Sequence, residues 1–551
     1  MSGKYTKIIF FSSKISTFDF RKWLCYPTRT KKGHIEAEQT ATRRKEMEHI
    51  HAGHGRNSIP RRKFMAMSAA AVCICALASS GFCADGNKAE IRLREAVAGD
   101  ACCTVSNVTV HVRDGMKITE VFYILKPGEH SFIRCRVAMP EESRWSGRMW
   151  GYGRGGWSGN DASMVGNAKG GDVAVSCDMG TGASTGWTRK HPPTTWEDDI
   201  WKDFGWRSTH LMTVYAKKFC KAFYGRVPAK SYFKGTSTGG GQGMHEAQRF
   251  PEDYDGIISE LPANSRVSLE ACAFQRRKLG KKLNLSDEQK QILSDATVGF
   301  MADKDAPFFV REKYLSDPRM CDRYAEAILD AAAKKDPVFA KPDVKTALLE
   351  IFSGPVHKNR RAHPGYSWGA LFNTSSGLFL FKIHYEKKHG RKFDANIATW
   401  DDFDDFVAAR KECLNATDPD LSAFAARGGK IIMTSGLEDQ TIPFTSAIDH
   451  YEEAAETAGG MKRLKSFFRM FLIPGCAHSD KGSAFQSCPA ADIKQTLVDW
   501  VEKGIAPEHL RCTGKKGETL DVPAYPSVAG DAFPEGKAPG GAVRRIHPFY
   551  R

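Results

Sequence analysis

Residues 235–239 read Gly-Thr-Ser-Thr-Gly and fit the pattern G-x-S-x-G, which places Ser237 on a tight turn. The motif follows a candidate strand at 231–234 and precedes a helical stretch at 241–250 that Pro251 ends. A serine on a strand-to-helix turn needs small neighbours, and the positive end of the helix favours an anion that develops beside it. This context predicts that Ser237 is a nucleophile. The alternative is a glycine-rich turn that only joins a strand to a helix.

A nucleophilic serine needs a base within hydrogen-bond reach, and the base needs an acid that fixes its tautomer. In hydrolases with this motif the chain order is serine, acid, histidine, with each residue on a loop after a strand. The strand 430–434 runs into a turn-rich loop that carries Asp439, and the strand 467–473 runs into a sharp turn that carries His478. We therefore predict Asp439 as the acid and His478 as the base, with Glu438 as the rival acid. The alternatives are a solvated loop carboxylate and a histidine with a structural hydrogen bond.

A tetrahedral intermediate carries a negative oxygen, and backbone N–H groups usually stabilise it. One N–H comes from the residue after the nucleophile, here Thr238, and a second comes from an earlier loop. The glycine-rich run 151–157 lets the backbone come close to a substrate, and we predict that Gly155 or Gly156 supplies the second donor. The alternative for this run is a flexible surface loop.

The elements that must position these residues alternate as in an α/β fold. Short β-type runs and helical patterns alternate over 85–265, and the alternation resumes over 426–551. Residues 266–425 are instead helical and charged, without a convincing strand series. The sequence thus predicts an α/β-hydrolase fold whose core is split by a large, mainly helical inserted lid domain. Strands are expected at 118–125, 132–137, 172–176, 231–234, 430–434 and 467–473, and helices at 207–224, 241–250, 445–457 and 490–503.

Residues 1–84 are predicted to be an upstream segment and an export signal outside the fold. The basic cluster 61–63 precedes an uncharged run, 64–84, that is rich in Ala and Ser and ends in small residues. This is the pattern of a signal peptide, and Arg61-Arg62 resembles a twin-arginine signal. The alternative is a transmembrane anchor. Because signals stand at chain starts, Met47 is the candidate initiator, and we expect a periplasmic or secreted protein without a stable membrane span.

The chain of 551 residues has a formal net charge of +16, but the excess is local. Residues 1–63 hold 15 Lys or Arg against 5 Asp or Glu, so only a small excess is spread over the rest. This distribution gives no basic face for a polyanion, and we expect no nucleic-acid partner. An apolar content of 41% is that of a globular protein with a sizeable core.

Cysteines and histidines give little support for a zinc site. No CxxC pair is present after residue 84, and His245-Glu246 is not a zinc motif because Arg249 stands where a second histidine is required. His210 is interpreted as a helix-packing residue. In an oxidising compartment we expect some of the eleven later cysteines to pair and at least one to stay single. They are Cys102, Cys103, Cys135, Cys177, Cys220, Cys272, Cys321, Cys413, Cys476, Cys488 and Cys512.

Several stretches resemble the tannase and feruloyl esterase family. They are residues 153–157 (GRGGW), 204–207 with His210, 235–240 (GTSTGG), 246–251, 255–257, 420–424, 428–430, 474–475 with His478, and 499–504 with 506–507. The resemblance runs in order over roughly residues 105–512. It implies an α/β hydrolase with a lid that cleaves esters of aromatic acids, such as gallates, hydroxycinnamates or terephthalate monoesters. It also implies triad roles for Ser237, Asp439 and His478.

The chain departs from the pattern of this family at a disulfide. Family members typically carry a cysteine just before the nucleophile and another just after the catalytic histidine, and the two are joined. Here these positions are Thr236 and Ser479. His478 must then be positioned by packing and hydrogen bonds, or by a substitute link through Cys476.

The lid of the family typically also binds calcium through a short Asp-rich loop. Calcium prefers about six to eight oxygen ligands. The comparable region here keeps acids without the tight spacing, and Asp295, Asp303 and Asp305 are only weak candidates.

The predicted function is an exported serine esterase that acts on aromatic acid esters, such as feruloyl or galloyl esters, through an acyl-enzyme and with no required cofactor. Two alternatives stay open. One is another serine hydrolase, such as a peptidase or lipase, and the other is a non-catalytic binding protein on a degenerate scaffold. The sequence does not name the substrate, because side chains of the lid set specificity.

Overall fold

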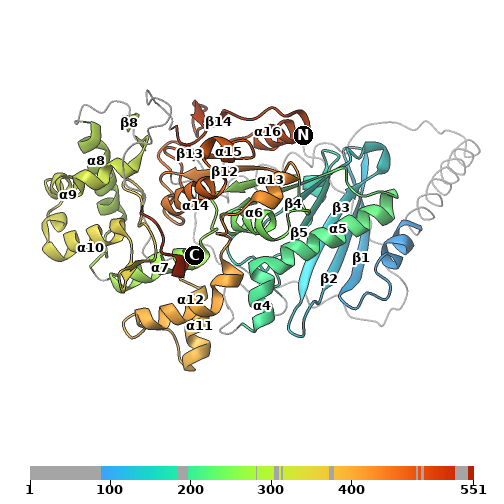
Figure 1. Ribbon diagram of the computed structural model, residues 1–551, viewed down its shortest axis with the longest axis horizontal. Coiled ribbons are helices and arrows are strands. Elements are labelled where there is room, and N and C mark those ends of the chain that lie inside the picture. The colour runs from blue at the N-terminus through green and yellow to red at the C-terminus, as the bar shows by residue number, and fades with distance from the viewer. Residues whose placement is uncertain are drawn as a thin grey trace, which may run out of the picture. The chain divides into compact units, whose positions relative to one another are not determined.

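The computed structural model describes residues 88–182, 196–280, 282–302, 310–311, 314–371, 378–478, 482–485, 489–527 and 544–551. Its centre is a nine-stranded sheet with the order β1-β2-β3-β5-β4-β6-β7-β12-β13 (Figure 1). The pairs from β1 to β5 are antiparallel, whereas those from β5 to β13 are parallel. The strands are Cys103–Arg113 (β1), Met116–Leu125 (β2), Ile133–Pro140 (β3), Arg148–Tyr152 (β4), Val173–Cys177 (β5), Lys230–Thr236 (β6), Gly256–Glu260 (β7), Lys430–Gly436 (β12) and Phe468–Ile473 (β13).

The central strands of the sheet are buried on both faces. Successive residues of the central strands alternate between two apolar clusters: Phe233 and Ile257 belong to one, and Tyr232 and Ile258 belong to the other. The first cluster includes side chains from three helices, α5 (Ser208–Tyr224), α6 (Thr238–Arg249) and α14 (Thr445–Thr457). The second includes side chains from α16 (Ile493–Lys503). A strand covered on both faces needs mainly apolar residues, which explains β13, where all six side chains are buried and only Arg469 is charged.

The structure confirms the predicted fold class. Each predicted strand and helix is present, with ends that differ from the expected ones by at most three residues. Sequence analysis missed β1, β4 and β7. The strands β4 and β7 have only five residues each, and β1 lies at the sheet edge with few buried side chains, so none shows a clear pattern.

The segment between β7 and β12 leaves the sheet unbroken, because these two strands pair directly in parallel. In the described residues this segment adds no strand to the central sheet and consists mainly of helices. They are α7 (Arg266–Lys278), α8 (Asp287–Ala302), α9 (Ala325–Ala333), α10 (Pro342–Ser353), α11 (Leu380–His389), α12 (Trp400–Leu414) and α13 (Ser422–Ala426). Side chains of α8, α9 and α10 share an apolar cluster of their own. This is the predicted helical insertion, although its boundaries at 266 and 425 stay predictions.

The export signal predicted at 61–84 lies outside the described residues. Of the helices that the structure does describe, none combines the length and the apolar character that a membrane crossing requires.

No disulfide joins any two of the ten cysteines in the described part of the chain. The prediction that some of them pair is therefore wrong for these ten, while Cys488 lies outside the described residues. Eight of the ten are buried, and Cys103, Cys135 and Cys220 belong to the main apolar cluster. A buried thiol acts as a small apolar side chain, which accounts for these cysteines without a covalent link.

Candidate active site

Ser237, Asp439 and His478 meet at the carboxyl ends of three parallel strands. Ser237 follows β6, Asp439 lies on the loop after β12, and His478 lies on the loop after β13. His478 Nε2 is 3.0 Å from Ser237 Oγ, and His478 Nδ1 is 2.8 Å from Asp439 Oδ2. The structure thus brings the three residues singled out in the sequence into one chain of hydrogen bonds.

The turn that carries Ser237 is strained. Its φ is 65° and its ψ is −124°, a conformation that costs a non-glycine residue about 1–3 kcal/mol. Close backbone contacts hold the turn in place. A Cβ at Gly235 would lie 2.1 Å from Gly239 O, and a Cβ at Gly239 would lie 2.9 Å from the carbonyl carbon of Gly153. The packing of the turn therefore requires both glycines of the motif.

Asp439, and not its rival Glu438, is the acid that faces the histidine. Its side chain is 1% exposed, and its Oδ1 accepts the backbone N–H groups of Thr441 and Ile442 at 2.8 and 2.7 Å. These bonds leave Oδ2 for the imidazole. Glu438 instead accepts hydrogen bonds from the N–H and hydroxyl of Ser483, at 2.8 and 2.6 Å.

The protonation of His478 follows from its surroundings. Burial by itself lowers the pKa of this imidazole, but the charge and hydrogen bond of Asp439 outweigh burial and raise the pKa above its usual value of 6.5. The carboxylate of Asp439 accepts only, so Nδ1 carries the proton and Nε2 is left to accept the hydroxyl proton of Ser237. The arrangement is that of a base with a fixed tautomer.

The backbone of His478 is also held, by a residue that sequence analysis missed. Its N–H donates to Gln440 Oε1 at 3.1 Å. At the family's first cysteine position, the hydroxyl of Thr236 donates to Glu260 Oε2 at 3.2 Å. Ser479, at the second position, lies outside the described residues, and no disulfide links Cys476 to another described cysteine. Sequence analysis predicted that His478 is positioned either by packing and hydrogen bonds or by a link through Cys476. The contacts described here are hydrogen bonds.

Two backbone segments border the serine. Thr238 is the first residue of α6, so its N–H has no carbonyl acceptor within the helix. On the other side, the glycine-rich loop packs on the turn through the contact of Gly153 with Gly239. A Cβ added to Gly155 or Gly156 would meet nothing within 4 Å, so both predicted oxyanion residues border open space.

Gln242 fixes the glycine-rich loop, and sequence analysis did not single it out. It lies on α6 and is 3% exposed. Its Oε1 accepts the backbone N–H of Arg154 at 2.9 Å, and its Nε2 donates to Thr209 Oγ1 at 2.8 Å. The N–H of Gly153 donates to Lys234 O, so the N–H groups of Gly153 and Arg154 both have acceptors. Gly155 is the next residue along the loop. A polar residue on the buried face of a helix was the available signal.

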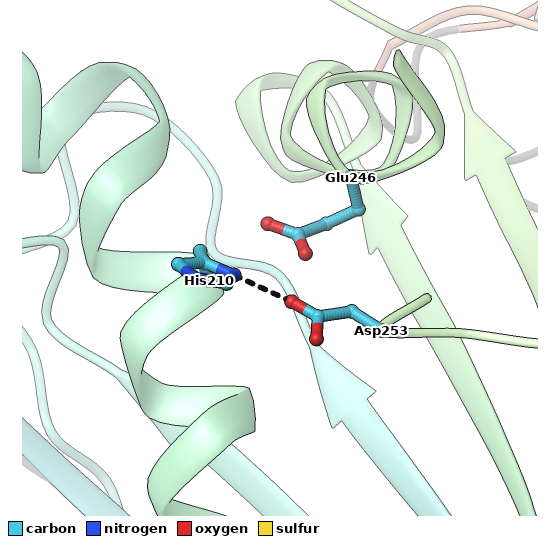
Figure 2. Close-up of side chains that lie close together, drawn as sticks. All are labelled: His210, Glu246 and Asp253. Carbon is cyan, nitrogen blue, oxygen red and sulfur yellow. Dashed lines mark hydrogen bonds and ion pairs between the residues drawn. The ribbon is translucent and has the colours of Figure 1, made fainter. Parts of the chain in front are cut away.

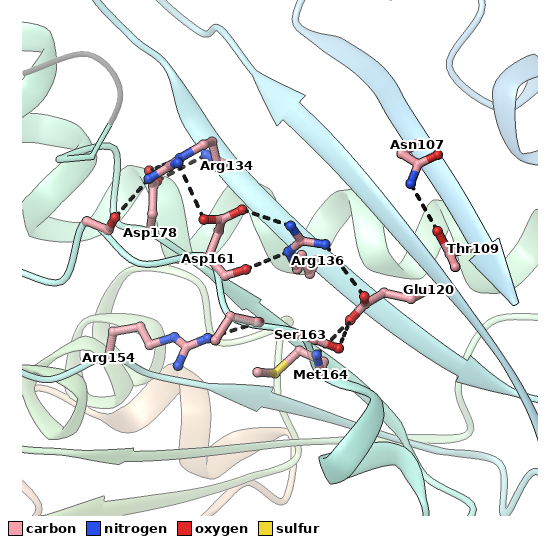
Figure 3. Close-up of polar contacts among 12 residues, drawn as sticks. Asn107, Thr109, Glu120, Arg134, Arg136, Arg154, Asp161, Ser163, Met164 and Asp178 are labelled. Carbon is pink, nitrogen blue, oxygen red and sulfur yellow. Dashed lines mark hydrogen bonds and ion pairs between the residues drawn. The ribbon is translucent and has the colours of Figure 1, made fainter. Parts of the chain in front are cut away.

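Ion pairs tie the continuation of this loop to the sheet (Figure 3). Asp161 lies 3.4 Å from Arg134 and 3.2 Å from Arg136, both on β3. Arg134 also pairs with Asp178 at 2.9 Å, and Arg136 with Glu120 on β2 at 3.5 Å. These pairs are partly or fully buried, so the loop is anchored by side chains of the neighbouring strands.

His210 belongs to a separate polar cluster between α5 and α6 (Figure 2). Its Nδ1 lies 2.7 Å from Asp253 Oδ2, and its ring stacks on Phe250 with centroids 3.7 Å apart. Glu246 completes the cluster, and burial raises its pKa well above the usual value. The three residues offer metal-ligand atoms within 4.8 Å of one another, but Lys217, 3.7 Å from Asp253 Oδ1, already supplies positive charge. His210 on α5 thus packs against Phe250 and Asp253, at and just after the end of α6.

The calcium hypothesis stays a prediction. Asp295 lies on the exposed face of α8, where its Oδ1 accepts Gln291 Nε2 at 2.8 Å. Asp303 and Asp305 lie outside the described residues.

Comparison with known proteins identifies relatives that match most of the chain. The family model "Tannase and feruloyl esterase" matches residues 117–369 and 371–533. The protein named "Probable feruloyl esterase B-2" of Aspergillus flavus is 29% identical over 448 residues, which are 76% of this chain and 82% of the relative. "Probable feruloyl esterase B-1" of Aspergillus fumigatus is 27% identical over 405 residues, 67% of this chain and 74% of the relative.

Solved structures share the fold. The feruloyl esterase B of Aspergillus oryzae superposes with a TM-score of 0.68 at 21% identity, over 80% of this chain and 96% of that chain. The tannin acyl hydrolase of Aspergillus niger does so with a TM-score of 0.62 at 17% identity, over 79% and 91%. Since the family model covers well over half of the sequence, the chain belongs to the tannase and feruloyl esterase family of carboxylic ester hydrolases.

Proposed function

We propose that the chain is an exported serine esterase that hydrolyses esters of phenolic aromatic acids through an acyl-enzyme. The observation that carries this proposal is the hydrogen-bond chain from Asp439 through His478 to Ser237. A serine hydroxyl becomes a strong nucleophile only when a base takes its proton as it attacks. The substrate class is supported by the relatives, which are feruloyl esterases and a tannin acyl hydrolase by name.

In the proposed reaction, Ser237 Oγ attacks the ester carbonyl carbon while His478 Nε2 takes the hydroxyl proton. The tetrahedral intermediate collapses as the bond to the leaving alcohol breaks, and His478 returns the proton to the alcohol oxygen. Water then attacks the acyl-enzyme with the same proton transfers, which releases the acid and restores Ser237. Asp439 stays ionised and stabilises the imidazolium that forms in each half of the cycle.

The negative oxygen of the intermediate would be met by backbone donors on both sides of the serine. Thr238 N–H lies at the positive end of α6, and Gly155 or Gly156 supplies a second N–H from the glycine-rich loop. Gln242 acts here as a positioning residue, because it holds this loop against the helix that carries Thr238.

A partly exposed aromatic side chain follows the proposed oxyanion loop and suits an aromatic acyl group. Trp157, which follows Gly156, is partly exposed and stacks on Phe379 with centroids 4.0 Å apart. The guanidinium of Arg266 lies 5.8 Å from the Trp157 ring centroid. Stacked aromatic rings favour offset contacts with another ring, so a phenolic acid can add to this stack.

The first test compares the chain from residue 85 with its Ser237→Ala variant on methyl ferulate, methyl gallate and a para-nitrophenyl alkanoate. We expect turnover of an aromatic ester and a loss in the variant on the order of 10⁶-fold in kcat. Ser422→Ala, an exposed serine on α13, serves as the control and should keep full activity. Aromatic ester turnover that survives in Ser237→Ala would exclude the proposed nucleophile. A preference for long-chain esters would favour a lipase instead.

The second test uses pH. His478 must be neutral to act as a base, so kcat/KM should rise with pH through the pKa of His478, with a midpoint above about 6.5 because Asp439 raises that pKa. Asp439→Asn removes this interaction and leaves burial, so the midpoint should move down while kcat falls about 10⁴-fold. Asp343→Asn, an exposed acid on α10, should change neither quantity. An unmoved midpoint in Asp439→Asn would contradict the role of Asp439.

The third test addresses the oxyanion loop. Gln242→Leu keeps the volume but removes the acceptor for Arg154 N–H, so we expect kcat to fall about 10- to 100-fold with little change in KM. Gln291→Leu, on the exposed face of α8, is the matched control. Equal kcat in both variants would show that the loop needs no such support.

Export is proposed from the sequence alone. The run 64–84 and the pair Arg61-Arg62 support a twin-arginine signal that is removed on export. When the chain is expressed from Met47 in a bacterium with this pathway, mass spectrometry of the periplasmic fraction should find a mature protein that starts near residue 85. The double variant Arg61→Lys, Arg62→Lys should accumulate inside the cell. An uncleaved cytoplasmic product from the unmodified sequence would refute the proposal.

A further inference from the structure

A series of hydrogen bonds joins the loop that follows β12 to the loop that follows β13. We call residues 437–444 the acid loop and residues 474–485 the histidine loop, of which 482–485 and 474–478 are described. Leu437 N–H donates to Ile473 O at 3.0 Å, and Glu438 N–H donates to Cys476 O at 2.9 Å. The next residue is Asp439, whose side chain receives His478 Nδ1, and Gln440 follows, whose side chain receives His478 N–H. Leu437 therefore contacts the end of β13, and the next three residues of the acid loop contact the histidine loop.

Glu438 binds Ser483, near the end of the histidine loop. Its two carboxylate oxygens accept the N–H and the hydroxyl of Ser483, at 2.8 and 2.6 Å. Ser483 directly precedes the two residues that close this loop, Ala484 and Phe485, whose N–H groups both donate to Gly475 O, at 3.1 and 2.9 Å. Glu438 thus holds Ser483, next to the two residues that bond Gly475 on the segment that carries His478.

Hydrogen bonds also hold the acid loop in place. Its first carbonyl, Leu437 O, accepts the hydroxyl of Ser367 at 2.7 Å, and Asp439 N–H donates to Gly436 O at 3.1 Å. The histidine loop has a further anchor in Lys515, whose ammonium donates to Gly482 O at 2.9 Å. Both loops also begin on neighbouring parallel strands that are paired up to Gly436 and Ile473.

We infer that Glu438 and Gln440 form a polar clasp that positions His478 between Asp439 and Ser237. Both residues flank Asp439 in the chain, so the clasp fixes the imidazole relative to the acid that must face it. Gln440 bonds the His478 backbone directly, and Glu438 bonds Ser483, beside the residues that bond Gly475. Neither residue touches the reacting atoms, so they are positioning residues. The catalytic consequence rests on the proposed function, whereas the alignment of the imidazole does not.

The test uses Glu438→Ala and Gln440→Ala, each in the chain from residue 85. We expect kcat on an aromatic ester to fall about tenfold or more with KM nearly constant, because misplacement of a base by about 1 Å costs up to 10²-fold. Glu288→Ala, an exposed carboxylate on α8, is the control and should keep its kcat. Gln440→Glu retains an oxygen at the same reach and should recover most of the loss.

A second readout does not depend on turnover. The proton between His478 Nδ1 and Asp439 should give a far-downfield proton NMR signal in the unmodified chain and in Glu288→Ala. It should broaden or disappear in Glu438→Ala and Gln440→Ala while circular dichroism and the melting transition still report a folded protein. A residue that only adds stability would lower Tm and leave this signal and kcat in place.

The inference is overturned if both alanine variants, when folded, keep kcat and the downfield signal. That outcome leaves the proposed function intact, because Ser237→Ala tests it separately. Conversely, an unmodified chain that turns over no ester but loses the downfield signal in the two variants refutes the proposed function and supports the clasp.

Discussion

The backbone conformation of Ser237 is the constraint on which the rest of the site depends. A serine with a φ of 65° stays in that conformation only where the surrounding backbone leaves it no other. Gly153, Gly235 and Gly239 supply this surrounding, since a Cβ at any of them would lie within 3 Å of a neighbouring atom. The same contacts pack the glycine-rich loop against the start of α6. One packing arrangement therefore sets both the proposed nucleophile and the backbone donors proposed to serve it.

The sheet provides the rigid frame for this turn. Its central strands are covered by helices on both faces and paired in parallel, which holds the ends of β6, β12 and β13 at one edge of the sheet. The helical segment between β7 and β12 does not interrupt the sheet, because these two strands pair directly. Residues far apart in sequence can therefore meet within hydrogen-bond distance, which short loops alone would not secure.

The sequence predicted the parts of the site that chemistry restricts most. Ser237 stands in a motif whose glycines the turn requires, and His478 and Asp439 follow strands with strong apolar runs, so order and context identified all three. The choice between Asp439 and Glu438 was harder, because both are carboxylates on one loop. Only the fold shows that Glu438 turns to Ser483. Gln440 was missed because a loop glutamine carries no signal of its own until its partners in space are known, and the only signal for Gln242 was its polar side chain on the buried face of α6.

The cysteine prediction failed for a different reason. The expectation that some cysteines pair relied on the compartment of the protein, which does not state which thiols lie near one another. Most of the described cysteines pack in the apolar core, where their burial explains them. The short strand β4 and the exposed edge strand β1 escaped notice because periodicity needs several buried positions to be recognised.

The serine and the histidine are held by different physical means, and this difference explains how polar contacts can suffice beside His478. The serine turn is fixed by backbone contacts, so positions such as Thr236 are free to make other bonds, here to Glu260. The histidine loop is fixed by side chains from the acid loop. A disulfide stabilises a protein mainly by restricting its unfolded chain, whereas alignment of an imidazole requires only one favoured position in the folded state. Several hydrogen bonds of about 1 kcal/mol each meet that requirement when both loops already start on paired strands.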